Sequence, residues 1–305
     1  MAPVDVPAMM KLPWGGPSLV AGVALIGLLA QIGPASATAR SPVAASRTSP
    51  SSLSSPSSLS TAAANARIGA SIDNKDDVGR LSKMMGRPLS SVRVYYALPP
   101  KTWSSSWILA TIPAHGIAVV SFTAGTPTHI RTFLASRPKT ITCYATYSHE
   151  PEDNFTTTAR KAAYRSTWQM YAPAIRAAGC VPTLILMKWS LNPQSGRHWR
   201  DWYPQGSVDA VAFDAYNTRV KLDDPAYADP TLFLAPILAV SRETGLPWGL
   251  AEVGSSIVIS PSRRAAWAHQ VVVLAVNRGA RFANWWDGKT TTFALDRTTA
   301  SVWHA

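Results

Sequence analysis

The sequence predicts a (β/α)8 barrel over residues 67–305. Short β-rich runs alternate with longer amphipathic runs along this part of the chain, which is typical of βαβ units and a parallel sheet. Eight such runs fall within 239 residues, the usual size of this barrel. A doubly wound open sheet is the alternative. It is disfavoured because the first run, Ile68–Asp73, is not followed by a Gly-rich phosphate-binding loop.

The eight predicted strands are short runs rich in β-branched and aromatic residues. They are Arg67–Ile72, Val92–Ala97, Ile117–Phe122, Thr140–Tyr147, Thr183–Lys188, Val208–Ala215, Trp248–Glu252 and Arg281–Trp286. Among the runs between them, Thr156–Ala178 has apolar residues at helical spacing. Pro261–Arg278 opens on Pro-Ser and stops at Gly279, as helices commonly do. Both runs are therefore predicted helices.

An uncharged apolar run, Leu19–Ala30, precedes the predicted barrel. Its 12 residues are too few to span a bilayer comfortably. The small-x-small pattern Ala35-Ser36-Ala37 follows and predicts cleavage before Thr38. We therefore expect residues 1–37 to be a signal peptide and the protein to be secreted and free of the membrane after cleavage. An uncleaved anchor is the alternative.

Residues 38–66 are predicted to form a disordered linker. Ten Ser and three Pro lie between Ser41 and Ser60, with no aromatic residue, so this segment has nothing with which to build a core. The sequence thus divides into a signal peptide (1–37), a linker (38–66) and a single catalytic-sized domain (67–305).

The formal net charge is +12, and residues 67–305 keep +10, because residues 1–66 hold three of the Lys/Arg and one of the Asp/Glu. A basic surface favours polyanionic partners. However, no run of Lys/Arg is interleaved with aromatic residues, so we expect a solvated basic surface and no nucleic-acid partner. Nothing in the sequence indicates an oligomer, and a monomer is expected.

The chain has two cysteines, Cys143 and Cys180. Cys143 lies in a predicted strand and Cys180 lies just before the next one, so adjacent strands could bring them together. Secretion permits a disulfide between them. Two buried free thiols are the alternative, which spacing alone does not exclude.

Acidic and aromatic residues gather where the predicted strands end, which is the face that carries the active site in such barrels. The candidates are Tyr95, His149, Glu150, Trp189, Asp214, Tyr216, Glu252 and Trp285. His and Cys do not occur at metal-ligand spacing, and no Gly-x-Ser-x-Gly nucleophile motif is present. No metal or cofactor is therefore expected. Sugars suit this mixture, because aromatic faces stack on their rings and carboxylates act on the glycosidic bond.

Three motifs carry a resemblance that extends over most of residues 67–305. They are His149-Glu150, Trp202-Tyr203-Pro204 leading into Val208–Tyr216, and Leu250–Gly254 around Glu252. In this order the motifs resemble glycoside hydrolase family 26, the mannanase-type branch of the clan with catalytic glutamates on strands four and seven. The resemblance implies a barrel enzyme that hydrolyses O-glycosidic bonds with retention.

The resemblance also implies roles for individual residues. Glu150 would be the general acid/base and Glu252 the nucleophile, with the two carboxyls about 5–5.5 Å apart. Tyr216 would hydrogen-bond and orient the nucleophile, and otherwise it is a core aromatic. His149 would contact the sugar or the acid, unless it is only packed. Asp214 would hold a sugar hydroxyl or brace the end of its strand.

Three aromatic residues are candidates for stacking on sugar rings. Trp285 would lie beneath the ring next to the scissile bond, and Trp189 and Tyr95 could contact it or its neighbours. Plain core packing is the alternative for each of them.

The chain departs from the family pattern after the predicted acid. It continues as Pro151–Phe155 where an Asn-Gly-like turn and a Trp-rich stretch are usual, and Glu152 is a competing acid. The predicted function is a secreted endo-acting β-glycanase for a β-mannan or β-glucan type of polysaccharide. The alternatives are a catalytically silent carbohydrate-binding barrel and an enzyme that remodels the producer's own cell wall.

Overall fold

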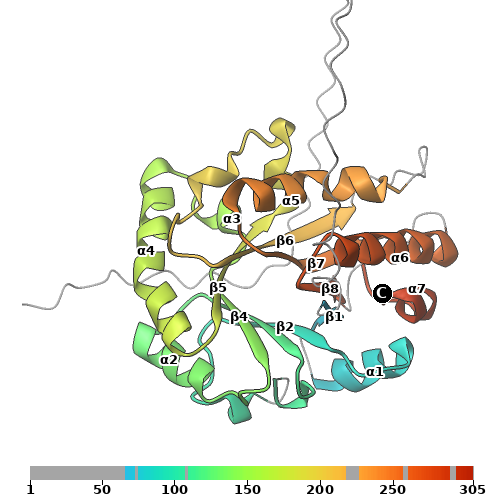
Figure 1. Ribbon diagram of the computed structural model, residues 1–305, viewed down its shortest axis with the longest axis horizontal. Coiled ribbons are helices and arrows are strands. Elements are labelled where there is room, and N and C mark those ends of the chain that lie inside the picture. The colour runs from blue at the N-terminus through green and yellow to red at the C-terminus, as the bar shows by residue number, and fades with distance from the viewer. Residues whose placement is uncertain are drawn as a thin grey trace, which may run out of the picture. The chain divides into compact units, whose positions relative to one another are not determined.

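Eight parallel strands close into one barrel in the order β1-β2-β3-β4-β5-β6-β7-β8 (Figure 1). The structure is a computed structural model, and it describes residues 66–72, 75–106, 109–217, 227–256, 260–288 and 293–304. The strands are β1 (Arg67–Ser71), β2 (Ser91–Tyr96), β3 (Ile117–Phe122), β4 (Thr142–Tyr147), β5 (Val181–Met187), β6 (Ala210–Asn217), β7 (Trp248–Ser255) and β8 (Phe282–Trp286).

Helices surround the barrel on its outer side (Figure 1). They are α1 (Lys75–Met85), α2 (Pro127–Ala135), α3 (Pro151–Asn154), α4 (Thr158–Ala177), α5 (Pro230–Thr244), α6 (Pro261–Asn277) and α7 (Arg297–Val302). Side chains cap the starts of five of them by accepting a backbone N–H of the first turn. These caps are Thr126, Thr157, Asp229, Ser260 and Asp296.

The predicted fold class is confirmed, and every predicted strand has a counterpart within a few residues. The main differences concern connections. The chain between β2 and β3 forms 3-10 turns at Trp103–Ser105 and Leu109–Thr111. The predicted signal peptide lies outside the described residues, and so does all of the predicted linker except Ala66.

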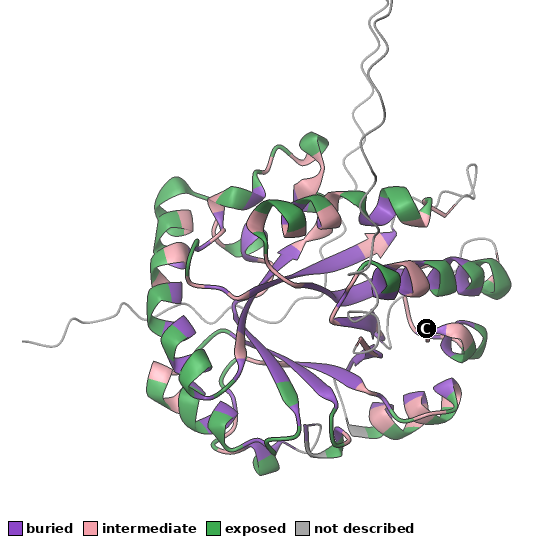
Figure 2. Cartoon of the chain, viewed as in Figure 1, coloured by how far each residue is buried: buried purple, intermediate pink, exposed green. Residues whose placement is uncertain are grey.

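Two apolar layers hold the barrel together. Figure 2 shows buried residues running along the strands and exposed residues on the outer sides of the helices. The smaller layer fills the barrel interior, where Tyr144 and Phe282 from opposite strands meet edge to face with ring centroids 4.8 Å apart. Gly69 allows β1 and β2 to approach closely, because a Cβ there would lie 1.6 Å from the Ser91 carbonyl oxygen.

A disulfide joins Cys143 of β4 to Cys180, which immediately precedes β5. The Cα atoms are 4.8 Å apart, because the two strands are neighbours in the barrel. The bridge spans 37 residues and encloses the whole of α4. Crosslinking a loop of this length stabilises the fold, chiefly by restricting the unfolded chain, by about 2–4 kcal/mol.

We predict that the double variant Cys143→Ala/Cys180→Ala remains folded but has a lower free energy of unfolding by about 2–4 kcal/mol. Alanine suits the site, since both cysteines are buried. Urea unfolding with and without a reductant measures the effect. The reduced native protein should match the double variant, and a reductant should leave the double variant unchanged. Equal midpoints for oxidised native protein and double variant would contradict the prediction.

Candidate active site

The carboxyl ends of β2, β4, β6, β7 and β8 bring polar side chains to one rim of the barrel. All eight strands are parallel, so their C-terminal ends share that rim. The contributed residues are Tyr95, His149, Glu150, Asp214, Glu252 and Trp286. Segments that are up to 191 positions apart, from Tyr95 to Trp286, therefore form one site.

Glu252 reaches the site through an irregularity in β7. Leu250 pairs with Phe213, but the next pair along is Glu252 with Asp214, so β7 holds one extra residue, Ala251. A bulge of this kind redirects the side chains that follow it. Ala251 packs in the interior layer, and Glu252, the very next residue, also contacts side chains inside the barrel.

Arg93 of β2 is the cation at the centre of the site, and its side chain is fully buried. Its two terminal nitrogens donate to the two carboxylate oxygens of Asp214, with Nη2 3.1 Å from Oδ2. Its Nε lies 3.7 Å from Oε1 of Glu252. A buried guanidinium needs such partners, because burying an unpaired charge is very costly.

Arg93 was not predicted as a site residue, because the prediction considered only strand ends and Arg93 lies three residues before the end of β2. The available signal was a charged residue within the otherwise apolar run Val92-Arg93-Val94. Burial alone lowers the pKa of Arg93, but the negative charges of Asp214 and Glu252 outweigh burial, so the pKa is raised and the guanidinium stays charged. Arg93 thereby places positive charge beside Glu252.

Tyr95, on the same strand as Arg93, holds Glu252. Its hydroxyl donates to Oε1 of Glu252 and lies 2.6 Å from the Ser71 hydroxyl. The Arg93 guanidinium lies 4.8 Å from the centre of the Tyr95 ring. Glu252 thus accepts a hydrogen bond and faces a cation, and both interactions favour its ionised form.

Glu150 occupies a sharp turn at the end of β4. Both Ser148 and Glu150 have φ of 47°, in the left-handed region, which costs a non-glycine residue roughly 1–2 kcal/mol. Backbone hydrogen bonds hold the turn on both sides: Ser148 N donates to Phe122 O at 2.8 Å and Glu150 N to Ile185 O at 3.1 Å. Strain of this kind is concentrated at functional sites.

The surroundings of Glu150 favour its protonated form. Burial raises the pKa of Glu150 to about 8, the charge of Asp214 adds to the rise, and Arg93 opposes it. The charge of Glu150 also contributes to raising the pKa of Tyr95, after burial and Asp214. Tyr95 hydrogen-bonds Glu252, so it interacts with both glutamates, with Glu252 by a hydrogen bond and with Glu150 through its charge.

His149 lies against Tyr95, with ring centroids 5.1 Å apart. Burial, and then the charge of Arg93, lower the pKa of His149 to about 3. The imidazole is therefore neutral at physiological pH. Its buried Nδ1 has no hydrogen-bond partner within the described part of the chain.

The predicted stacking role of Trp285 is wrong. Trp285 is fully buried; its Nε1 donates to Phe293 O at 2.9 Å, and its ring packs edge to face on Trp303 at 5.2 Å. The neighbouring Trp286 is half-buried and lies beside Tyr216, 5.5 Å away between ring centroids. Successive strand residues point to opposite faces, so an error of one position in strand phase exchanges the core and the site tryptophan.

Two other predicted roles are corrected in part. Tyr95, and not Tyr216, hydrogen-bonds Glu252. The bulge pairs Glu252 with Asp214, whereas Tyr216 lies level with Gly254, farther toward the rim. Asp214 is buried with both oxygens on Arg93, so it braces the strand end and does not hold a sugar hydroxyl.

Glu152, the competing acid, is buried within α3. Its Oε1 accepts the Met187 N–H at 3.0 Å, which ties α3 to the end of β5. Burial raises the pKa of Glu152 to about 8, although hydrogen bonds oppose the rise. Its 1% exposure excludes contact with a ligand from solvent. By contrast, Trp189, just after β5, is 45% exposed and available for stacking.

Among the described residues, no three His, Cys, Asp or Glu side chains come together in a way that could hold a metal ion. Over the same residues, every helix is too short or too polar to cross a membrane.

No protein-family model and no curated protein matches this chain. Solved structures, however, match it in fold. The GH26 domain of PbGH26-GH5A, an endo-β-mannanase/endo-β-glucanase from Prevotella bryantii, is 13% identical, with a TM-score of 0.52, over 78% of this chain and 88% of that one. The catalytic domain of the GH26 endo-β-1,4-mannanase from Bacillus sp. JAMB-750 is 14% identical, with a TM-score of 0.52, over 77% and 80%.

A third solved structure, ZgEngAGH5_4 in complex with a cellotriose, is 13% identical, with a TM-score of 0.51, over 79% of this chain and 95% of that one. At these identities the likeness concerns the fold. The chain is thus similar in its barrel to GH26 and GH5 glycoside hydrolase domains.

We predict that Asp214→Asn destabilises the protein by about 3–5 kcal/mol, because it leaves the buried Arg93 without its main counter-ion. Denaturant unfolding at pH 7 measures the change. The matched control is Asp201→Asn, which breaks the more exposed pair with Lys161 at 2.7 Å and should cost less than about 1 kcal/mol. Equal losses for the two variants would contradict the role given to Arg93.

We predict that Glu152→Gln weakens the pH dependence of stability between pH 6.5 and 8. The folded pKa of Glu152, about 8, exceeds the ordinary glutamate value of 4.5, so the unfolded chain releases this proton first and stability falls as pH rises through that window. One such proton contributes roughly 1.4 kcal/mol per pH unit. Glutamine keeps an acceptor for Met187 and removes this slope.

The control for this prediction is Glu243→Gln, at the exposed ion pair with Arg200, which should leave the slope unchanged. Unfolding free energies at several pH values from 6 to 8.5 provide the measurement. A Glu152→Gln slope identical to that of the native protein would show that Glu152 is ionised in the folded state.

Proposed function

We propose that residues 67–305 form a retaining endo-acting β-glycanase, secreted by way of the predicted signal peptide. One observation supports the proposal: two glutamates on β4 and β7 act on the same tyrosine, Tyr95, one through its charge and the other through a hydrogen bond, yet their surroundings differ. Burial raises the pKa of Glu150 to about 8, whereas Glu252 faces Arg93 and accepts the Tyr95 hydroxyl. Paired carboxyls, one protonated and one ionised, are what glycoside hydrolysis with retention requires.

In the first step, Glu150 donates its proton to the glycosidic oxygen and a carboxylate oxygen of Glu252 bonds to the anomeric carbon. The bond from that carbon to the leaving oxygen breaks, and a glycosyl-enzyme ester forms. In the second step, Glu150 takes a proton from water, whose oxygen attacks the anomeric carbon and releases Glu252. This reaction requires the two carboxyls to be about 5–5.5 Å apart.

Neighbouring residues would hold the sugar. The neutral, half-buried His149 would accept a hydrogen bond from a sugar hydroxyl or donate one to it through a ring nitrogen, depending on its tautomer. Trp286, half-buried at the end of β8, is placed to stack on the ring at the cleavage point, as aromatic faces do with sugars. The exposed Trp189 would stack on a sugar ring farther along the polysaccharide.

The fold likeness and the aromatic side chains at the rim support the choice of substrate class. The similar barrels are described as endo-β-mannanases, as an endo-β-glucanase and as a complex with cellotriose. We therefore propose a β-mannan or β-glucan type of polysaccharide. Purified cell walls are the further substrate to include, because residues 67–305 carry a net charge of +10 that would favour acidic wall polymers.

We predict that Glu150→Gln and Glu252→Gln each lower hydrolysis by at least about a thousandfold, since each group is needed for bond cleavage. The assay measures reducing ends released from β-mannan, mixed-linkage glucan, xylan and purified cell walls. NMR of the first product gives the anomer, and retention is expected. Glu152→Gln is the control that distinguishes Glu150 from Glu152 as the general acid. This variant should retain activity, because Glu152 is buried.

Azide rescue distinguishes the two roles more sharply. On an aryl β-glycoside, Glu150→Ala with azide should give the β-glycosyl azide, because azide attacks the covalent intermediate. Glu252→Ala with azide should give the α-glycosyl azide, because azide replaces the missing nucleophile. An inverted product from the native protein would remove Glu252 from the role of nucleophile. Absence of hydrolysis together with saturable binding would favour a silent carbohydrate-binding barrel.

A further inference from the structure

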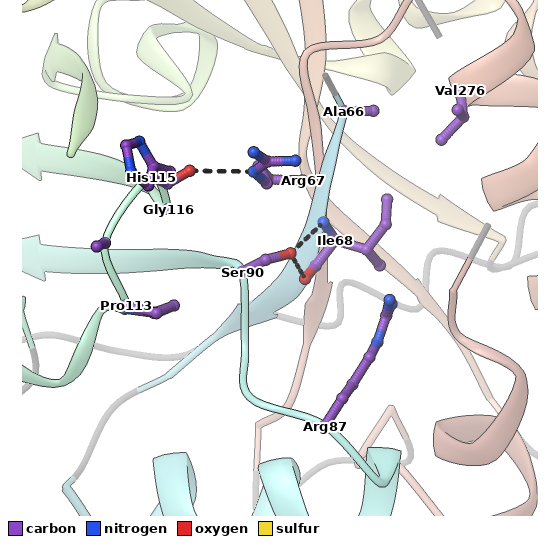
Figure 3. A pocket seen from close by; sticks show the side chains of 10 residues that line it. Ala66, Arg67, Ile68, Arg87, Ser90, Pro113, His115, Gly116 and Val276 are labelled. Atoms are coloured by element: carbon purple, nitrogen blue, oxygen red, sulfur yellow. Dashed lines mark hydrogen bonds between the residues drawn. The ribbon is translucent and has the colours of Figure 1, made fainter. Parts of the chain in front are cut away.

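A pocket opens at the end of the barrel opposite the glutamates, among the starts of β1, β2 and β3 (Figure 3). Its volume is about 480 Å³, within the range of ligand-binding pockets. Its ten lining residues include Arg67, Ile68, Arg87, Pro113, His115 and Val276. Since the glutamates lie at the strand C-termini, this pocket is separate from the candidate active site.

The polar lining of this pocket is basic. Arg67, Arg87 and His115 contribute to it, and none of its ten lining residues is Asp or Glu. Arg67 donates from Nε to His115 O at 3.0 Å, and its terminal nitrogens have no partner among the described residues. Burial lowers the pKa of Arg87, as expected for a cation without a counter-ion.

Arg87 is only partly satisfied where it lies. Its Nη2 donates to Trp303 O at 3.2 Å, but its Nε is buried without a hydrogen-bond partner in the described chain. Figure 3 shows Arg87 reaching from the loop after α1 toward the start of β1. A buried donor left unpaired is unfavourable, so the described chain does not fully satisfy this guanidinium.

The backbone holds the pocket in shape. His115 has φ of 63°, and Gly116 N donates to Pro113 O at 2.9 Å, which closes a tight turn. A Cβ at Gly116 would come within 2.6 Å of the Ile112 side chain, so the turn needs glycine there. The aliphatic side chains of Ile68, Pro113 and Val276 add an apolar wall.

We propose that this pocket binds an acidic sugar unit, through the carboxylate of a hexuronate or the phosphate of a sugar phosphate. The guanidiniums of Arg67 and Arg87 would take the anionic oxygens, as Arg does in carboxylate and phosphate recognition. The volume exceeds what an inorganic anion needs, and the apolar wall suits a carbon skeleton. The choice of a sugar rests on the proposed function, whereas the anion chemistry rests on the pocket alone.

The test follows the ring signals of His115 by NMR in the full-length protein at constant ionic strength. The probes are glucuronate and glucose 1-phosphate, with acetate, inorganic phosphate and neutral glucose as references. We expect saturable shifts with the two acidic sugars, at lower concentrations than with acetate or phosphate, and none with glucose. Glucuronate compared with glucose 1-phosphate identifies which anionic group is preferred. Binding of acidic sugars no tighter than of simple anions, or equal binding of glucose, would overturn the proposal.

Variants locate the binding. Arg67→Gln and Arg87→Gln should each raise the Kd of the better probe roughly three- to tenfold, the loss of one charge-assisted contact. The matched control is Arg160→Gln, an exposed arginine on α4, which should change the Kd less than about twofold. Arg67→Gln remains informative should Arg87→Gln fold poorly, because Arg67 contributes only one side-chain hydrogen bond.

Equal effects of Arg67→Gln and Arg160→Gln would show general electrostatic attraction and overturn the site. Glu252→Gln should bind the probes as the native protein does, whatever its hydrolytic activity. Failure of this pocket and failure of the proposed hydrolysis are therefore separate results.

Discussion

The arrangement of side chains at the C-terminal ends of the strands depends on the burial of one cation, Arg93. A guanidinium without exposure to water must be matched by negative charge, and Asp214 supplies it through both carboxylate oxygens while Glu252 lies 3.7 Å from Nε. Glu150 is a third carboxyl in the same region. With Arg93 already matched, a further negative charge there is disfavoured, and the pKa of Glu150 is raised to about 8 by burial and by Asp214. Arg93 lies beside Glu252, whereas at Glu150 burial and the charge of Asp214 outweigh the opposing charge of Arg93.

Two backbone irregularities determine where Glu150 and Glu252 lie relative to Arg93. An extra residue in β7 turns Glu252 inward immediately after Ala251, and two left-handed residues redirect the chain after β4 so that Glu150 starts α3. Each departs from ideal geometry and has a cost. The hydrogen-bonded strands on either side and the buried Glu152, which holds α3 to β5, resist relaxation of these turns.

The two ends of the barrel carry opposite chemistry. Carboxyls and aromatic rings surround Arg93 at the strand C-termini, whereas the pocket at the N-termini of β1 to β3 presents basic groups without an acid among its lining residues. The apolar interior layer around Tyr144 and Phe282 separates them. Because the strands are parallel, residues from distant segments reach each end together.

The sequence alone determined the barrel and its eight strands, because alternating apolar periodicity and turn residues are local signals. It placed Glu150 at the end of its strand, but β7 continues three residues past Glu252. It left the Cys143–Cys180 pairing open and chose Trp285, which is buried in the core, over Trp286, because strand phase is not visible in a run of apolar residues. Only the tertiary structure placed Arg93 between Asp214 and Glu252 and gave Tyr95, in place of Tyr216, the hydrogen bond to Glu252. Those contacts join residues more than 100 positions apart, and their geometry depends on barrel closure and on the bulge in β7, which no local pattern encodes.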